Sequence, residues 1–199
     1  MVEHQLRRRG LSDQRVLDAM VEVPRECFVP ERRRTRAFFD QALEIGEGQT
    51  ISQPWIVAST AALLELRGHE RVLDVGTGSG YAAAVLSRLC REVITVERRP
   101  ALAAWAAERL TRLGFEQVQV RVGDGALGAP DYAPFGGILV SATAEGHLPA
   151  ALLEQLEDGA ALVCPVRRGG QERLVRFRDG SEEILTAVRF VPLVTDAPA

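Results

Sequence analysis

The spacing of apolar and polar positions changes near residue 71 and separates two kinds of structure. Residues 3–35 have helical spacing with many polar positions. We expect Ser12 to be the N-cap of one helix, and the bond between Val23 and Pro24 to end it, because a residue before proline avoids the helical region. The apolar side of this helix would carry Val16, Leu17, Met20 and Val21.

The next segment, residues 36–52, has no clear period, and Gly46 and Gly48 are typical of a loop. Ser52 is then expected to be a second N-cap, with Pro54 in the first turn of an apolar helix that reaches about residue 66.

Beyond residue 71, short apolar runs alternate with helical patterns, which predicts parallel strands joined by right-handed crossovers. The predicted strands are 72–75, 93–97, 118–122, 137–140 and 160–164, and the predicted helices are 81–90, 101–113 and 149–156. Residues 172–178 and 184–194 flank a short polar turn, which predicts a β-hairpin. The fold class is therefore α/β, with a mostly parallel sheet, an antiparallel C-terminal element and a helical N-terminal extension.

Composition and charge narrow the class of protein. Apolar residues make up 46% and charged residues 26% of 199 residues, as in an ordinary globular chain. We expect a single domain, divided into an N-terminal extension with a substrate loop (1–52), a cofactor-binding core (53–165) and a C-terminal hairpin (166–199). With 24 basic and 27 acidic residues the net charge is −3, which argues against a nucleic-acid partner.

The cysteine pattern points to a reducing compartment, and the histidine and hydropathy patterns argue against a metal site and a membrane span. The three cysteines are far apart and odd in number, and the three histidines have no ligand-like spacing, so neither disulfides nor a metal site is expected. The first residues lack an apolar signal core, and no run is long enough to span a membrane. We expect a cytoplasmic monomer without a membrane partner.

A glycine-rich turn, DVGTGSGY at 74–81, follows one predicted strand and opens a predicted helix, which is the context of a nucleotide site. Gly76, Gly78 and Gly80 alternate, whereas the dinucleotide fingerprint G-x-G-x-x-G would need a glycine at Tyr81. Glycines allow close approach of a ligand to the backbone, and Thr77 lies within the same turn. The alternative is a tight turn without a ligand.

Three acidic residues lie at the ends of three consecutive predicted strands, which suggests S-adenosylmethionine as the ligand. Asp74 would repel a pyrophosphate but attract the ammonium and sulfonium groups of this cofactor. Glu97, 23 residues later, would accept hydrogen bonds from ribose hydroxyls, and Asp124 beside Gly125 would accept one from the adenine amino group. The alternatives are an exposed glutamate at a strand end and a simple Asp-Gly turn.

Several segments outside the glycine turn resemble the protein-L-isoaspartate O-methyltransferase family over roughly residues 5–194. The matching segments are VPRECFVP (23–30), GEGQTISQP (46–54), VGDG (122–125), APF (133–135) and VRFVPL (188–193). The resemblance implies a Rossmann-like S-adenosylmethionine-dependent methyltransferase fold. It also implies methyl transfer to the α-carboxylate of isoaspartyl residues in damaged proteins or peptides, after which the ester collapses to a succinimide.

The same resemblance assigns the substrate side of the site. It implies that Ser52 is the active-site residue at the isoaspartyl carboxylate, with Thr50, Ile51 and Pro54 shaping the pocket and Val191 in its wall. Since the carboxylate is ionised at neutral pH, no general base is needed. Ser52 would orient an oxygen rather than act as a nucleophile, and its alternative role is that of a helix cap alone.

Departures from the family pattern leave the choice of substrate open. They are Glu44 in place of a common proline, Gly136 in place of an acidic residue, and the segment 143–147. One alternative is an O-methyltransferase of the same fold that acts on an aspartate or another carboxylate in a specific biosynthetic peptide or small molecule. Another is a non-catalytic binding module that has kept the fold.

Overall fold

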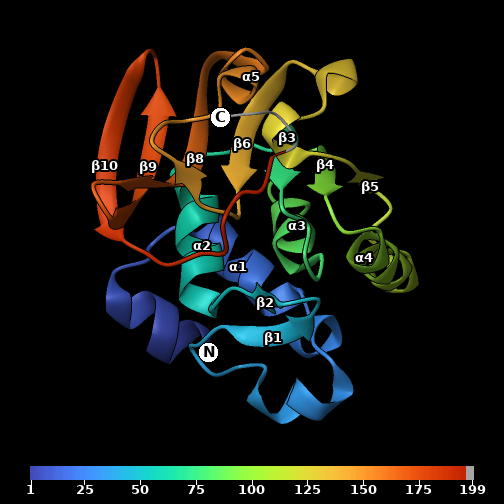
Figure 1. Ribbon diagram of the computed structural model, residues 1–199. Helices are drawn as coiled ribbons and strands as arrows, with labels where there is room; N and C mark the ends of the chain where they lie inside the picture. Colours follow the sequence, from blue (N-terminus) through green and yellow to red (C-terminus); the bar gives the residue numbers. More distant parts are fainter. Residues whose placement is uncertain (196–199) are drawn as a thin grey trace.

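A mixed sheet forms the centre of the computed structural model, which describes residues 1–195 (Figure 1). Its strands are β3 (Arg71–Val75), β4 (Glu92–Glu97), β5 (Val118–Val122), β6 (Phe135–Val140), β7 (Ala144–Glu145), β8 (Leu156–Arg168), β9 (Gln171–Arg178) and β10 (Ser181–Ala187). They lie in the order β10-β9-β8-β6-β3-β4-β5, and β7 pairs with β8. Strands β3 to β8 run parallel, whereas β9 and β10 are antiparallel, which confirms the predicted fold class.

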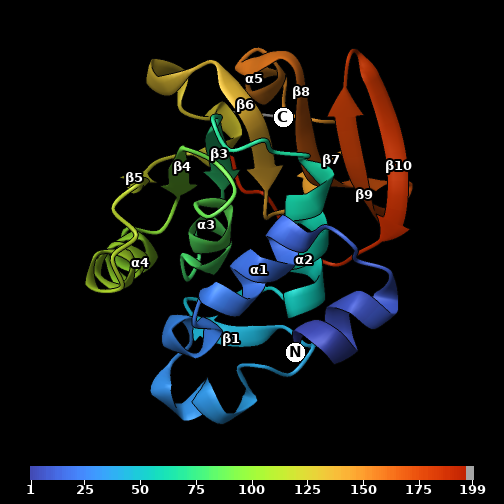
Figure 2. The same ribbon diagram turned by 180° about the vertical axis from the view of Figure 1, so that it is seen from behind.

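Helices cover the sheet on both sides. The α-helices are α1 (Gln14–Glu22), α2 (Pro54–Leu63), α3 (Tyr81–Leu86), α4 (Pro100–Arg112) and α5 (Ala150–Leu153). Shorter helical segments of other types span Val2–Leu6, Arg7–Arg9, Arg25–Phe28, Glu31–Arg36, Gly125–Leu127 and Pro130–Tyr132. Seen from behind, α1 lies against α2 and α3 below the sheet (Figure 2). Within residues 1–195, no helix has the length and apolar character needed to cross a membrane.

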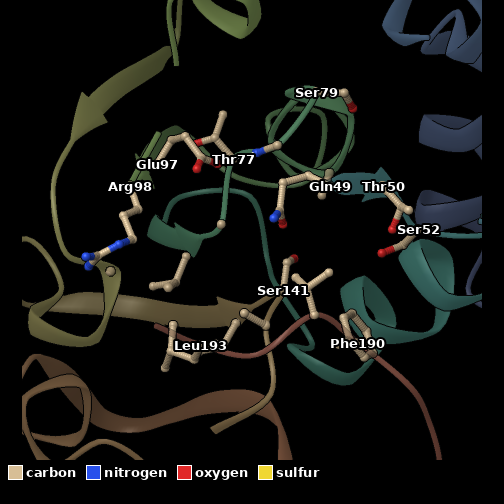
Figure 3. A pocket seen from close by; sticks show the side chains of 18 of the residues that line it. Gln49, Thr50, Ser52, Thr77, Ser79, Glu97, Arg98, Ser141, Phe190 and Leu193 are labelled. Atoms are coloured by element: carbon tan, nitrogen blue, oxygen red, sulfur yellow. Dashed lines mark hydrogen bonds between the residues drawn. The ribbon is translucent and has the colours of Figure 1, made fainter. Parts of the chain in front are cut away.

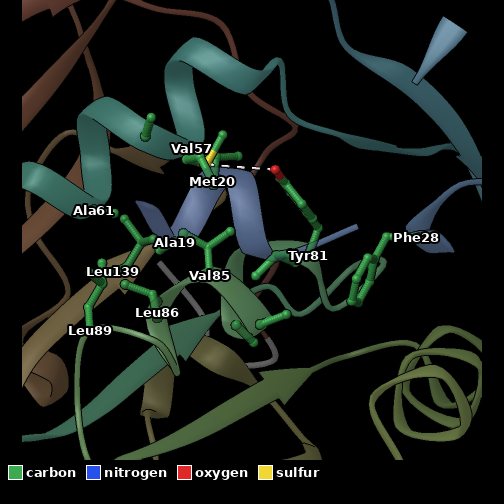
Figure 4. Close-up of a cluster of buried hydrophobic side chains, with 14 of the residues drawn as sticks. Ala19, Met20, Phe28, Val57, Ala61, Tyr81, Val85, Leu86, Leu89 and Leu139 are labelled. Carbon is green, nitrogen blue, oxygen red and sulfur yellow. Dashed lines mark hydrogen bonds between the residues drawn. The ribbon is translucent and has the colours of Figure 1, made fainter. Parts of the chain in front are cut away.

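Two hydrophobic cores form because side chains alternate along each strand. Val72 of β3 packs into the core shared with α1, α2 and α3, whereas Leu73 and Val75 pack into the core shared with α5. Figure 4 shows the first core, where Met20 of α1 and Val57 of α2 meet residues of α3. Burial on both faces explains why these strands are continuous apolar runs.

The N-terminal extension contains strands that the sequence pattern did not reveal. Residues 36–52 were expected to be irregular, but β1 (Leu43–Gly46) and β2 (Gln49–Ile51) form a two-stranded antiparallel hairpin. Leu43 and Ile51 are buried partners in this hairpin, and Ile45 is buried as well. Strands of four and three residues are too short to show a clear period in the sequence. The hairpin lies below the carboxyl ends of the parallel strands (Figure 1).

Both predicted N-caps are wrong by one residue. Asp13, not Ser12, caps α1, because its carboxylate accepts a hydrogen bond from the amide of Val16 at 3.1 Å. Gln53, not Ser52, precedes α2, and neither of these two side chains caps the helix; the Asp40 carboxylate accepts from the amide of Trp55 at 3.2 Å instead. Val21 is also exposed rather than on the buried side of α1, whereas the predicted end of α1 at Val23 is confirmed.

Several predicted elements extend too far. Helix α3 ends at Leu86, and α2 ends at Leu63. Strand β10 ends at Ala187, so residues 188–194 do not continue the C-terminal hairpin as expected. This segment, which we call the strap, leaves the end of β10 and crosses toward the ends of β6 and β3 (Figure 1). Residues 196–199, assigned to the same hairpin from sequence, lie outside the described part of the chain.

The cap of α1 can be tested directly. Asp13→Ala should lower the free energy of unfolding by about 1 kcal/mol, because an amide in the first turn loses its acceptor. Ser12→Ala should change it much less. Urea unfolding of both variants measures the difference, and equal losses would contradict the assignment of the cap to Asp13.

Candidate active site

One cavity of about 400 Å³ lies at the carboxyl ends of β3, β4 and β6, a size typical of a small-molecule site. Its walls come from the β1–β2 hairpin with the start of α2, the glycine turn, the loops after β4 and β6, and the strap. Figure 3 shows Thr50 and Ser52 on one side and Glu97 and Arg98 on the other. Segments far apart in sequence therefore meet in one space.

Most of the expected site residues line this cavity. Those in its wall are Thr50, Ile51, Ser52, Gly76, Thr77, Gly78, Glu97, Gly125 and Val191. Four others lie behind the wall rather than in it, and these are Pro54, Asp74, Gly80 and Asp124.

The glycine turn has a backbone that requires glycine. Gly76, Gly78 and Gly80 have φ angles of 94°, 52° and 86°, in the left-handed region. A Cβ on Gly80 would come within 3.2 Å of the Leu110 side chain, so this glycine lets α3 pack closely on α4. The turn exposes backbone to the cavity without a side chain in between.

Glu97, the last residue of β4, fastens the glycine turn. Its carboxylate accepts hydrogen bonds from the amide of Gly78 at 2.9 Å and the amide of Arg99 at 3.0 Å. The side chain is almost buried yet lines the cavity. Two backbone donors thus hold this carboxylate in one orientation at the cavity wall, which makes it a preorganised acceptor for ligand hydroxyls.

Asp74 is fully buried beneath the turn. The hydroxyl of Thr95 donates to its carboxylate at 2.7 Å, and the hydroxyls of Thr95 and Thr77 are 2.6 Å apart. The other carboxylate oxygen of Asp74 has no hydrogen-bond partner among the described residues. Burial raises the pKa of Asp74 to about 7, and the neighbouring charge of Glu97 acts in the same direction. Asp74 therefore reaches the cavity only through the two threonines.

Asp124 and Gly125 shape the loop after β5. The Asp124 carboxylate accepts from the amide of Ala126 at 2.9 Å and caps the short helical segment Gly125–Leu127. A Cβ on Gly125 would lie 2.5 Å from Val75, so only glycine allows this close approach of the loop to β3. Gly125 thereby forms part of the cavity wall.

The strap closes the lower side of the cavity with apolar residues. Phe190 and Leu193 lie beneath the space shared by Thr50 and Glu97 (Figure 3). Thr143 holds the strap, since its amide donates to the carbonyl of Val191 and its carbonyl accepts from Leu193, each at 2.8 Å. The strap thus excludes water from one side of the site.

Sequence reasoning missed several lining residues. They include Gln49, Ser79, Arg98 and Ser141. Ser141 could have been found, because it directly follows β6 and open α/β sheets bind ligands at carboxyl strand ends. Phe190 and Leu193 belong to the segment RFVPL (189–193), which the family resemblance places in the pocket wall as a strand; they line the cavity from the strap instead.

The arrangement favours binding and alignment rather than proton transfer. The charged groups in the wall are carboxylates and guanidinium groups, and none of the described lining residues is a histidine, cysteine or lysine. Hydroxyl and amide groups line the side of the hairpin, and backbone and a fixed carboxylate line the side of the glycine turn. Such a cavity can hold two reactants side by side.

Comparisons with known proteins agree with this geometry. The family model described as "Protein-L-isoaspartate(D-aspartate) O-methyltransferase" matches residues 1–197. A protein-L-isoaspartate O-methyltransferase of Roseiflexus castenholzii is 54% identical over 191 residues, which cover 94% of this chain and 87% of that protein.

Solved structures show the same architecture. A protein-L-isoaspartate O-methyltransferase superposes with a TM-score of 0.86 at 28% identity, covering 98% of this chain and 67% of the other. A Plasmodium falciparum structure, described as an enzyme of that type in complex with S-adenosyl-L-homocysteine, gives a TM-score of 0.81 at 24% identity, with 94% of each chain covered. At this identity the second likeness shows the fold.

The buried Asp74 predicts a distinct pH dependence of stability. Its pKa is about 7 when folded and near 3.8 when unfolded, so the folded chain holds the extra proton between these values and its stability falls as pH rises through them. Asp74→Asn lacks this contribution. Its stability relative to wild type should therefore rise by roughly 1 kcal/mol per pH unit from pH 5 to 7 and level off above.

Urea unfolding at pH 5, 6, 7 and 8 measures this difference. Glu65→Gln is a matched control, because hydrogen-bonded ion pairs with Arg178 and Arg176 lower the pKa of Glu65. The pH dependence that Glu65 gives to stability therefore lies below pH 5. A flat difference between Asp74→Asn and wild type over this range would contradict the raised pKa.

Proposed function

Because the chain belongs to the protein-L-isoaspartate O-methyltransferase family, we propose that it repairs damaged proteins and peptides by methylating the α-carboxylate of L-isoaspartyl residues, with S-adenosylmethionine as the methyl donor. One observation carries this proposal. The family-specific segment 46–54 folds into the hairpin that brings Thr50 and Ser52 to the cavity of the glycine turn.

The residues of the glycine-turn side fit S-adenosylmethionine. Glu97 would accept hydrogen bonds from the ribose hydroxyls, and the backbone from Gly76 to Gly80, with Thr77, would surround the methionyl part. Gly125 would border the adenine. When bound, the cofactor supplies an electrophilic methyl group on a positively charged sulfur.

Asp74 and Asp124 contribute to this side indirectly. Asp74 holds Thr77 through Thr95, and its partial negative charge lies below the expected position of the ammonium group. Asp124 holds the loop that carries Gly125. We propose that both carboxylates fix the shape of the cofactor site.

On the substrate side, the task of the protein is alignment. A free α-carboxylate is ionised at neutral pH, so no residue has to remove a proton before its oxygen bonds to the methyl carbon. Ser52 would orient that carboxylate by donating a hydrogen bond, with Thr50, Ile51 and Pro54 shaping its surroundings. Phe190 and Val191 of the strap would keep water away from the ionised oxygen. Correct alignment alone can be worth roughly 7–11 kcal/mol.

The departures from the family pattern do not support another substrate. Glu44 faces away from the cavity and pairs with Arg33 at 2.7 Å. Gly136 packs on Glu70, where a Cβ would lie 2.7 Å from the side chain. Thr143 holds the strap from behind, outside the cavity wall. No residue that faces the cavity therefore favours the alternative of a dedicated biosynthetic peptide.

We further infer that the extension, the core and the C-terminal segment work as a single catalytic domain and as a monomer, because all three supply walls to one cavity. The three cysteines are free thiols, two of them buried, which fits a reducing cytoplasm.

The decisive experiment compares two short peptides that differ only in carrying isoaspartate or aspartate at one position. In aspartate the carboxylate lies one methylene farther from the main chain, and a displacement of 1 Å can cost about a hundredfold in rate. Labelled methyl transfer should be efficient to the first peptide and about a hundredfold slower to the second. Equal labelling of both, or labelling of neither while a small carboxylic acid is methylated, would remove the proposal.

Ser52→Ala tests the substrate side alone. Methyl transfer to the isoaspartyl peptide should fall by about tenfold to a hundredfold, because the carboxylate loses its orienting donor. Cofactor affinity, measured by calorimetry, should stay unchanged. Stability should also stay within about 0.5 kcal/mol, since no helix cap is lost. Unchanged transfer would show that the Ser52 hydroxyl has no role in the reaction.

A further inference from the structure

Arg25 is a fully buried arginine that binds the main chain of the substrate loop. It lies in the short helical segment Arg25–Phe28, directly after Pro24. Its Nε donates to the carbonyl of Ala37 and its Nη2 donates to the carbonyl of Ser52, both at 2.7 Å. Burial lowers the pKa of this guanidinium. Burying such a group is costly, so its two in-plane bonds to carbonyls are a specific arrangement.

The face of the same guanidinium rests on the cofactor side of the site. The Arg25 Cζ lies 4.8 Å from the centre of the Tyr81 ring. Tyr81 is the first residue of α3, directly after Gly80, and it lines the cavity. Its ring is fixed in the core, where its hydroxyl lies 3.7 Å from the sulfur of Met20 (Figure 4).

One rigid group therefore touches both halves of the site. It donates to the carbonyl of Ser52, and it lies over the ring of Tyr81, the residue that follows the glycine turn. The planar guanidinium forms bonds in fixed directions, which a lysine ammonium cannot reproduce. Arg25 therefore connects the Ser52 loop to the residue that follows the glycine turn through one buried side chain.

We infer that Arg25 is a positioning residue for methyl transfer. It acts through Ser52 and holds the substrate loop in a fixed position relative to the glycine turn. The inference rests on the proposed function, since it assumes that the two reactants lie on these two sides. Arg25 itself does not line the cavity. Its loss should therefore impair alignment, and hence kcat, more than it impairs binding of either reactant.

Arg25→Lys is the test, and Arg15→Lys is the control for an exposed arginine that bridges carbonyls away from the cavity. Arg15 of α1 also bridges two carbonyls, those of Leu66 and Leu89, and neither residue lines the cavity. Arg25→Lys should lower kcat for the isoaspartyl peptide by at least about tenfold. Its KM and its affinity for S-adenosylmethionine should change by less than about threefold. Arg15→Lys should leave all three values near those of wild type.

Several outcomes would overturn the inference. They are an unchanged kcat in Arg25→Lys, an equal fall of kcat in Arg15→Lys, or a loss of cofactor affinity in Arg25→Lys as large as the loss of kcat. Failure of the proposed function is distinguishable, because wild-type protein itself would then not methylate the isoaspartyl peptide.

A measurement on the wild-type chain covers the case in which Arg25→Lys does not fold. The buried Nε–H of Arg25 should give a slowly exchanging signal in ¹⁵N NMR spectra. This signal should shift when the isoaspartyl peptide is added to protein saturated with S-adenosylhomocysteine, and should shift much less with the aspartyl peptide. A signal that responds to neither peptide, while the isoaspartyl peptide binds, would overturn the inference.

Discussion

The hydrogen bond from the amide of Gly78 to the carboxylate of Glu97 is the contact on which the site depends. The turn between β3 and α3 must pass through left-handed backbone angles three times within five residues, and no other residue type does this without strain. Glycines alone would leave such a turn free to adopt many shapes. Glu97 selects one of them from the end of the neighbouring strand, and the same carboxylate remains in the cavity wall. The Glu97 side chain thus fixes the shape of the turn and also lines the cavity that receives the ligand.

Around that turn, the molecule is organised by the two faces of the sheet. The parallel strands are buried on both sides, so they form a rigid platform, and the cavity lies at the carboxyl ends of β3, β4 and β6. The hairpin β1–β2 and the strap then approach this edge from opposite ends of the chain (Figure 1). Thr143, which follows β6, holds the strap by two hydrogen bonds. Arg25 binds the carbonyl of Ser52 after the hairpin and lies over the ring of Tyr81 at the start of α3.

The parallel core could be predicted from sequence because its strands are apolar runs separated by helical patterns. The two turns on the cofactor side could be predicted because each contains glycines, Gly76 to Gly80 in one and Gly125 in the other, that the backbone requires. The caps could not be placed, since Ser12 and Asp13 are both good N-caps and only the backbone angle decides between them. The strap was mistaken for a strand because residues 188–194 form an almost continuous apolar run rich in valine, while pairing with β9 ends at Ala187. The burial of Asp74 was also hidden, because a carboxylate beside a glycine turn gives the same sequence pattern whether it faces the ligand or supports the turn.

The position of the strap also determines which damaged proteins can be repaired. Thr143 holds its middle, and the carboxylate of Glu172 accepts from the amide of Phe190 at 3.2 Å, so the strap is tied on both sides. A client polypeptide must therefore insert its altered residue into a cavity with one immobile wall, which requires a segment that can bend away from its own fold. For a folded client, the free energy of local opening around the lesion then sets the rate of repair. Lesions in flexible loops and termini would be corrected first, and those in stable helices and strands would persist until the client partly unfolds.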